Sequence, residues 1–212
     1  MSGYNAMELM ICCAARLLED GRTVAVGTGV PCAAAMLAQR TAAPNLVIFF
    51  EAGGVAPQLP TMPISVGDSR TFYRGLMATS MADVMETCQR GMMDYTFLGG
   101  AQIDPFGNLN STMLGADYAK PKVRFPGSFG SAYLYYVVPR VILFRLEHSR
   151  RTLVPKVDFI SAPGSSPDNV FRPGGPIALI TNRCLFDFDR ARRRCRASAP
   201  SVAHSHYRSS SS

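Results

Sequence analysis

Two short apolar segments with a helical pattern between them constrain the fold of this chain more than any other feature. The first runs from Thr23 to Gly27 (T-V-A-V-G) and the second from Asn45 to Phe50 (N-L-V-I-F-F). Continuous apolar runs of this length are typical of strands buried on both faces. Pro31 fits the first turn of a helix that ends near Arg40. This strand–helix–strand order predicts an α/β fold, with an open, mostly parallel sheet and flanking helices.

The rest of the chain continues this alternation. An amphipathic pattern predicts an opening helix from Asn5 to Asp20, with Gly21 as its stop. A third helix is expected from Ser80 to Arg90, because Ser80 and Asp83 have the spacing of a capping box. Further segments with strand composition are Asp94 to Gly99, Val157 to Ile160, Ile177 to Thr181 and the stretch from Ala132 to Leu146, which Pro139 is expected to divide between two elements.

The positive charge of the chain is concentrated at its C-terminal end. The net charge is +7, and the segment from Arg190 onward contains six arginines and no acidic residue. The rest of the chain is therefore nearly neutral. The Ser- and His-rich end has few large apolar residues to offset its ordering entropy. We therefore expect one domain over residues 1–199 and a disordered tail over residues 200–212. Non-specific nucleic-acid binding would rest on this tail alone and ranks last among the functions considered.

The cysteines and histidines favour a cytoplasmic protein without a metal site. Six cysteines form no C-x-x-C pair, and three histidines, two of them in the tail, offer little for zinc. No signal peptide or run of about 18 apolar residues is evident, so no membrane association is expected. Cys32 opens a helix, where its pKa could be lowered, but a small buried hydrophobic role is preferred.

The candidate site begins at Glu51, which ends an apolar strand and precedes an Ala-Gly-Gly sequence. In an open parallel sheet the carboxyl ends of the strands line the ligand crevice. Gly53 and Gly54 would let a backbone or ligand approach closely, so we place them among the substrate-binding residues. Taken alone, a glutamate here is more often a cap or an ion-pair partner, for instance of Arg70 or Arg74.

Two further segments join this site. Gly99 and Gly100 follow another strand and, with Gln102, begin G-G-A-Q-I-D-P-F-G-N-L-N, in which D-P-F-G is a turn signal. Gly127 and Ser128 open a glycine-containing loop, G-S-F-G-S-A, whose backbone N–H groups could hold an anion or oxyanion. The preceding basic residues Lys120, Lys122 and Arg124 could meet the phosphates of a nucleotide-like ligand.

Together, these segments resemble the beta-type subunit of family I coenzyme A transferases, with glutaconate CoA-transferase as the nearest pattern. The similarity rests on E-A-G-G, on G-G-A-Q-I-D-P-F-G-N-L-N-S-T and on K-P-K-V-R-F-P-G-S-F-G-S, in that order. It is extended by V-G-T-G-V-P, S-V-G-D, V-D-F-I-S-A-P-G and I-T-N, and runs from about Asn5 to Pro200.

The resemblance implies the CoA-transferase (NagB/RpiA-like) fold and a covalent mechanism. Glu51 would be the nucleophile that forms a glutamyl-CoA thioester, while the Gly130 amide would stabilise the oxyanion. CoA would be a substrate, and neither a metal nor a separate cofactor is implied. The site would be completed by an alpha-type subunit, and the substrates would be an acyl-CoA and a carboxylic acid such as glutaconate.

The chain departs from the family pattern at three places. Ala52 replaces a serine or asparagine after the glutamate, and Phe129 and Ser131 replace a glycine and an alanine in the loop. If position 129 needs a positive φ, its phenylalanine is strained and could narrow the pocket. The family's subunit also continues past Pro200 with a further folded segment. The alternatives are therefore a decarboxylase or hydrolase of a CoA thioester, or a truncated subunit with impaired catalysis.

Overall fold

A nine-stranded sheet organises the computed structural model, which describes residues 3–189 and 191–200. In spatial order its strands are β13 (Arg194–Pro200), β12 (Cys184–Asp189), β11 (Gly175–Thr181), β10 (Arg140–Arg145), β5 (Tyr95–Leu98), β1 (Thr23–Val26), β2 (Val47–Phe50), β3 (Gly54–Val55) and β4 (Met77–Ala78). Two ribbons accompany it, β6 (Gln102–Ile103) with β7 (Leu109–Asn110) and β8 (Met113–Leu114) with β9 (Val123–Arg124). The helices are α1 (Ala6–Ala15), α2 (Val30–Arg40), the 3-10 turn η1 (Ser69–Phe72), α3 (Met81–Gln89) and α4 (Ser131–Val137).

The centre of the sheet is parallel and its margins are antiparallel. β11, β10, β5, β1 and β2 run in the same direction. β12 on one side and β3 on the other run against it, and the outermost strands β13 and β4 are each antiparallel to their neighbour. The predicted open α/β sheet is therefore confirmed at its centre, and the complete sheet is mixed. Helix α2 connects β1 to β2 and α4 lies between β5 and β10, as the strand–helix–strand pattern requires, whereas the connection from β10 to β11 contains no helix.

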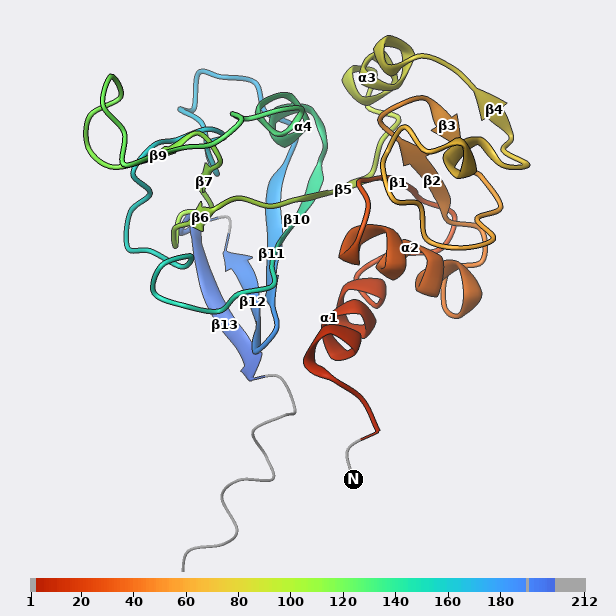
Figure 1. Cartoon of the computed structure of the whole chain (residues 1–212), viewed down its shortest axis with the longest axis horizontal. Helices are drawn as coiled ribbons and strands as arrows, with labels where there is room; N and C mark the ends of the chain where they lie inside the picture. Colours follow the sequence, from red (N-terminus) through yellow and green to blue (C-terminus); the bar gives the residue numbers. More distant parts are fainter. Residues whose placement is uncertain (1–2, 190, 201–212) are drawn as a thin grey trace, which may run out of the picture.

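The parallel strands are buried on both faces, which accounts for their continuous apolar sequences. Val24 and Val26 of β1 pack in one core with α1 and α2, while Ala25 belongs to the opposite core with α3 and α4. Helices α1 and α2 lie side by side (Figure 1). No helix in the described part of the chain is long and apolar enough to cross a membrane.

The local signals at helix ends predicted most boundaries. Ser80 caps α3 and forms the expected capping box with Asp83, and Pro139 lies between α4 and β10. The opening helix ends earlier than Asp20, at Ala15. The Asp20 carboxylate instead accepts hydrogen bonds from the backbone and side-chain amides of Asn45, tying the chain before β1 to the chain before β2.

One strand prediction in the C-terminal third was wrong, and one strand was missed. Val157 to Ile160 forms no strand, and the chain just after it meets β7 in an isolated bridge between Ala162 and Leu109. The Arg-rich segment that was given no secondary structure forms β13, paired with β12, although its sequence has few large apolar residues. Cys195 of β13 packs on the core, which explains how this strand is held. The tail predicted beyond Pro200 lies outside the described residues.

Candidate active site

A cavity of about 270 Å³ lies where the central parallel strands end. Its lining includes Glu51 after β2, Gly27 after β1 and Gly99 after β5. The loop before α4 contributes Ser128 to Ser131. The carboxyl ends of parallel strands thus bring together three segments that are far apart in the sequence, as the crevice rule predicts.

The Glu51 carboxylate is half-buried and is not engaged by another side chain. Within the described residues it makes no hydrogen bond or ion pair. Arg70 pairs instead with Asp68 at 3.4 Å and donates to the Met62 carbonyl at 2.9 Å, while Arg74 lies over the Tyr73 ring. The ion-pair alternative for Glu51 is therefore wrong, and its carboxylate faces the cavity as an uncommitted nucleophile or base.

Gly130 lies directly against this carboxylate. A Cβ atom at Gly130 would be 3.1 Å from Glu51 Oε1 and 3.6 Å from Leu134 Cδ1. Gly130 has helical φ and ψ and caps α4, so glycine is needed here for space rather than for backbone conformation. Its backbone N–H donates to no acceptor in residues 3–189 and 191–200. A residue with a free backbone donor therefore adjoins a free carboxylate in the lining of the cavity.

Phe129 occupies the backbone conformation that its replacement of a glycine suggested. Its φ is +49°, in the left-handed region, and its side chain is 74% exposed at the mouth of the cavity. The next substituted position, Ser131, lines the same cavity and donates a short hydrogen bond from its hydroxyl to the Ser128 carbonyl. The loop therefore places a bulky side chain on a left-handed residue at the rim of the cavity.

The glycines after Glu51 do not line the cavity. Gly53 and Gly54 are buried, and a Cβ atom on either would collide with the carbonyl oxygen of Thr79 or Thr71, respectively. Gly53 also has φ +111° in the turn that reverses the chain into β3. These two residues allow backbone segments to pack behind Glu51, and they position it rather than face a ligand.

The G-G-A-Q segment divides in the same way. Gly99 lines the cavity. Gly100 does not, and a Cβ atom on it would lie 3.0 Å from the Asn110 carbonyl oxygen. Gln102 is buried, and its side-chain oxygen accepts from Asn110 Nδ2 at 2.7 Å and from the Asp158 backbone N–H at 3.0 Å. The polar residues of this motif therefore hold the β6–β7 ribbon in place beside the site.

The loop start and the basic run lie at increasing distance from Glu51. Gly127 has φ +113° and donates to the Ser111 carbonyl at 3.0 Å, which turns Ser128 into the cavity. Lys120, Lys122 and Arg124 are exposed on and beside β9, and none of them lines the cavity. The β9 ribbon lies on the side of α4 away from β1 and β2 (Figure 1).

Sequence reasoning missed the residues that form the apolar wall of the cavity. Val84 and Met85 come from α3, and Leu134 and Phe144 come from α4 and β10. In the sequence they carry the same helical and strand periodicity as core residues, so no local signal separates them. Thr28 could have been found, since it lies in the V-G-T-G-V-P segment that follows β1.

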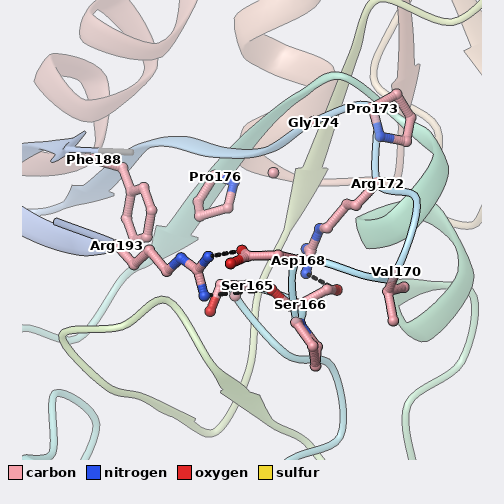
Figure 2. A pocket seen from close by; sticks show the side chains of 13 residues that line it. Ser165, Ser166, Asp168, Val170, Arg172, Pro173, Gly174, Pro176, Phe188 and Arg193 are labelled. Carbon is pink, nitrogen blue, oxygen red and sulfur yellow. Dashed lines mark hydrogen bonds and ion pairs between the residues drawn. The ribbon is translucent and has the colours of Figure 1, made fainter. Parts of the chain in front are cut away.

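A second hollow, of about 330 Å³, lies at the start of β11 and is lined by none of the residues of the Glu51 cavity (Figure 2). Its charged groups are engaged within the chain. Arg193 forms an ion pair with Asp168, and Arg172 donates to the carbonyls of Pro163 and Tyr135. Figure 2 shows the Arg193–Asp168 pair and the hydrogen bond from Arg172 to Ser166 Oγ inside the hollow, so fewer of its charged groups are free than in the Glu51 cavity.

The cysteines and acidic residues give no second centre. Cys32 is fully buried, and burial raises its pKa to about 11, which supports the structural role preferred for it. Cys12, Cys13, Cys32, Cys88 and Cys195 are free thiols. The described residues contain no group of three His, Cys, Asp or Glu side chains that could hold a metal ion.

Comparison with known proteins identifies the family of this chain. Residues 7–202 match the model of the coenzyme A transferase family. The chain is 38% identical over 194 residues to the B subunit of 3-oxoadipate CoA-transferase from Pseudomonas knackmussii, covering 88% of this chain and 74% of the relative. It is 31% identical over 205 residues to the B subunit of glutaconate CoA-transferase from Acidaminococcus fermentans, covering 91% and 76%.

Solved structures agree with this result. Glutaconate CoA-transferase from Acidaminococcus fermentans superimposes with a TM-score of 0.85 at 30% identity, over 94% of this chain and 80% of that one. The decarboxylase AibA/AibB superimposes with a TM-score of 0.80 at 29% identity, over 92% and 78%. The chain belongs to the coenzyme A transferase family. Within it, the chain is similar to the B subunits, as the sequence motifs predicted, and the predicted CoA-transferase activity is supported.

Proposed function

We propose that this chain supplies the covalent carrier of a CoA-transferase, with Glu51 as the nucleophile. The observation that carries the proposal is the free Glu51 carboxylate in the strand-end cavity, next to Gly130, whose backbone N–H donates to no acceptor within the described residues. A carboxylate that is unpaired and partly desolvated is a better nucleophile than one held in an ion pair.

In the first step a Glu51 oxygen attacks the thioester carbonyl carbon of the acyl-CoA. The C–S bond breaks, CoA leaves as a thiolate, and a mixed anhydride remains. The thiolate then attacks the Glu51 carbonyl carbon, the anhydride C–O bond breaks, and the first acid departs as a carboxylate. An incoming carboxylate attacks the glutamyl-CoA thioester, and the same two steps in reverse give the new acyl-CoA and restore Glu51. The scheme requires no metal or further cofactor, since CoA is itself a substrate.

Each addition step places negative charge on a former carbonyl oxygen. The Gly130 N–H is suited to stabilise this charge, because it has no competing acceptor within the described residues. Ser128 and Gly99, on the same cavity wall, would contact the acyl portion of the substrate. Gly53, Gly54, Gly100 and Gln102 would act by holding these groups in position, and Gly127 by turning the loop.

The substrate class and partner follow from the relatives. Their names specify 3-oxoadipate and glutaconate, both dicarboxylic acids, and both names denote a B subunit. We therefore assign a dicarboxylyl-CoA and a carboxylic acid as substrates and an alpha-type subunit as the partner that completes the enzyme. The free thiols favour the cytoplasm as its location.

A second candidate is decarboxylation of a CoA thioester, favoured by the altered rim at Phe129 and by the likeness to AibA/AibB. A decarboxylase would release carbon dioxide without an acceptor acid, whereas a transferase exchanges CoA only when an acceptor is present.

The deciding experiment is to assemble the chain with its alpha-type subunit, add acyl-CoA and trap the enzyme with hydroxylamine. Mass spectrometry should locate the modification at Glu51, and the Glu51→Gln variant should lose both the modification and CoA exchange. Glu86→Gln, a change at an exposed glutamate of α3 paired with Arg90, is the matched control. An assembled enzyme that exchanges CoA without modification of Glu51 would refute the covalent role.

A further inference from the structure

A third hollow, separate from the one at the start of β11, adjoins the Glu51 cavity and shares two of its residues. It measures about 500 Å³, and both Ser111 and Phe129 line it as well as the cavity that contains Glu51. A ligand whose reacting carbonyl lies at Glu51 can therefore extend past Phe129 into this neighbouring space. The remaining lining includes Arg145, Glu147 and Arg151.

Arg145 is the least engaged cation of this hollow. It ends β10, its side chain is 34% exposed, and within the described residues its guanidinium makes no hydrogen bond. Its one ion-pair contact, with Glu147, is long at 3.8 Å. Its Nε is buried without an acceptor. A partly buried guanidinium with unmade hydrogen bonds is costly, so an acceptor from outside the chain would stabilise it.

The carboxylate in the hollow does not cancel this charge, because other groups already hold it. Glu147 accepts from Ser149 Oγ at 2.7 Å and from Arg151 Nη2 at 3.1 Å. The Ser149 hydrogen bond and then the Arg151 guanidinium lower the pKa of Glu147. Glu147 and Arg151 thus neutralise one another, which leaves Arg145 as the net positive charge.

Ser111 offers a second polar group at the boundary between this hollow and the Glu51 cavity. Its Oγ is buried and has no hydrogen-bond partner, although its backbone N–H donates to Ser161 Oγ at 2.9 Å. The backbone is therefore fixed while the hydroxyl is uncommitted. A change of χ1 rotamer would turn this hydroxyl toward a ligand that passes Phe129.

We infer that this hollow binds the distal carboxylate of a dicarboxylic acyl group, with Arg145 as its main contact and Ser111 as its second. The inference rests on the proposed function, since it assumes that the other end of the acyl group reacts with the Glu51 carboxylate. A planar guanidinium suits a carboxylate because it can donate two parallel hydrogen bonds. The phosphates of CoA carry similar charge, but the pantetheine arm separates them from the thioester, whereas this hollow adjoins the reacting centre.

The test compares two acceptor acids of equal length, glutarate and pentanoate, with the assembled enzyme. The ratio of kcat/KM for glutarate to that for pentanoate measures recognition of the distal carboxylate. In Arg145→Gln this ratio should fall by about 10- to 100-fold, the loss expected for hydrogen bonds to a charged group. Arg145→Lys keeps the charge without the paired donors, so its kcat/KM ratio should lie between those of the parent enzyme and Arg145→Gln. Arg90→Gln, at an exposed arginine of α3, is the matched control.

The outcomes separate the subsite from the covalent mechanism. An unchanged ratio in Arg145→Gln, or an equal fall for both acids, overturns the subsite. A higher KM for acyl-CoA with an unchanged ratio assigns Arg145 to the CoA phosphates and also overturns it. If the enzyme exchanges no CoA and Glu51 stays unmodified, the proposed function fails. Calorimetry with glutarate and pentanoate then decides the subsite, because glutarate binding that is weakened in Arg145→Gln supports it and unaffected binding does not.

Discussion

Glu51 and Gly130 are in contact across the strand-end cavity, with Glu51 Oε1 only 3.1 Å from the place where a Cβ atom on Gly130 would lie. The contact joins the end of β2 to the first turn of α4, which are far apart in the sequence. It restricts where the carboxylate can lie. The Gly130 N–H donates to no acceptor within the described residues and would be available to the proposed oxyanion.

Gly130→Ala should therefore reduce catalysis without disturbing the fold. The helical φ and ψ of Gly130 accept alanine, but the methyl group would displace the Glu51 carboxylate by a few tenths of an ångström. Because an ångström of misplacement can cost about 10²-fold in rate, we expect kcat/KM to fall by up to about 10²-fold.

Steady-state CoA exchange and the urea midpoint of the assembled enzyme would check this prediction. Gly67→Ala is the matched control, since a Cβ atom there meets nothing within 4 Å and its φ is not positive. Full activity in Gly130→Ala would show that the contact does not constrain the nucleophile.

Phe129 should carry backbone strain that glycine would relieve. Its φ of +49° is unfavourable for a residue with a side chain, and its ring is 74% exposed and contributes little burial. Phe129→Gly should raise the free energy of unfolding by about 1 kcal/mol, measured by urea denaturation.

A matched variant separates this strain from the effect of the ring. Phe129→Ala removes the ring but keeps a side chain at positive φ, so it should not gain stability. Both variants remove the ring that separates the Glu51 cavity from the hollow beside Arg145, and both should accept bulkier acyl groups than the parent enzyme. A gain in stability for alanine as large as that for glycine would refute the strain explanation.

The sequence was informative where one local rule determines a structure. The buried strands, the Ser80 cap and the break at Pro139 each follow from a few neighbouring residues, and the structure confirms them. β13 could not be found in this way. Its stability comes from pairing with β12 and from the burial of Cys195, and neither is encoded in its own Arg-rich composition.

The same distinction applies to the site. Glu51, Gly99 and Ser128 follow strands or precede a helix, so topology alone brings them to one edge of the sheet. The glycines at 53 and 54 look like binding residues in the sequence, because close approach of a ligand and close approach of a backbone require the same residue. Arg145 shows the converse, since nothing in the sequence reveals that its Nε has no acceptor.

Asp83 should make the stability of the chain depend on acidic pH. Hydrogen bonds from Thr79 and then Ser80 lower its pKa to about 2 from a usual value of 3.8. The ionised form is therefore favoured in the folded state, and its contribution is fully present above about pH 4 and lost as the pH falls through about 2. Urea midpoints of the parent chain should fall across this window more steeply than those of Asp83→Asn, and equal slopes would contradict the assignment.

Gly53 and Gly54 should prove to be packing residues rather than contacts for CoA. A Cβ atom on Gly53 would collide with the Thr79 carbonyl, and one on Gly54 with the Thr71 carbonyl, and neither backbone can move independently of the turn after Glu51. Alanine at either position should lower the free energy of unfolding by about 1–3 kcal/mol or more.

Gly21→Ala provides a control for backbone strain alone, because Gly21 also has a positive φ but nothing lies within 4 Å of its Cβ position. Urea denaturation and CoA titration of the assembled variants would distinguish the two roles. A stable Gly54→Ala enzyme with weakened CoA affinity would assign that glycine to the binding surface instead.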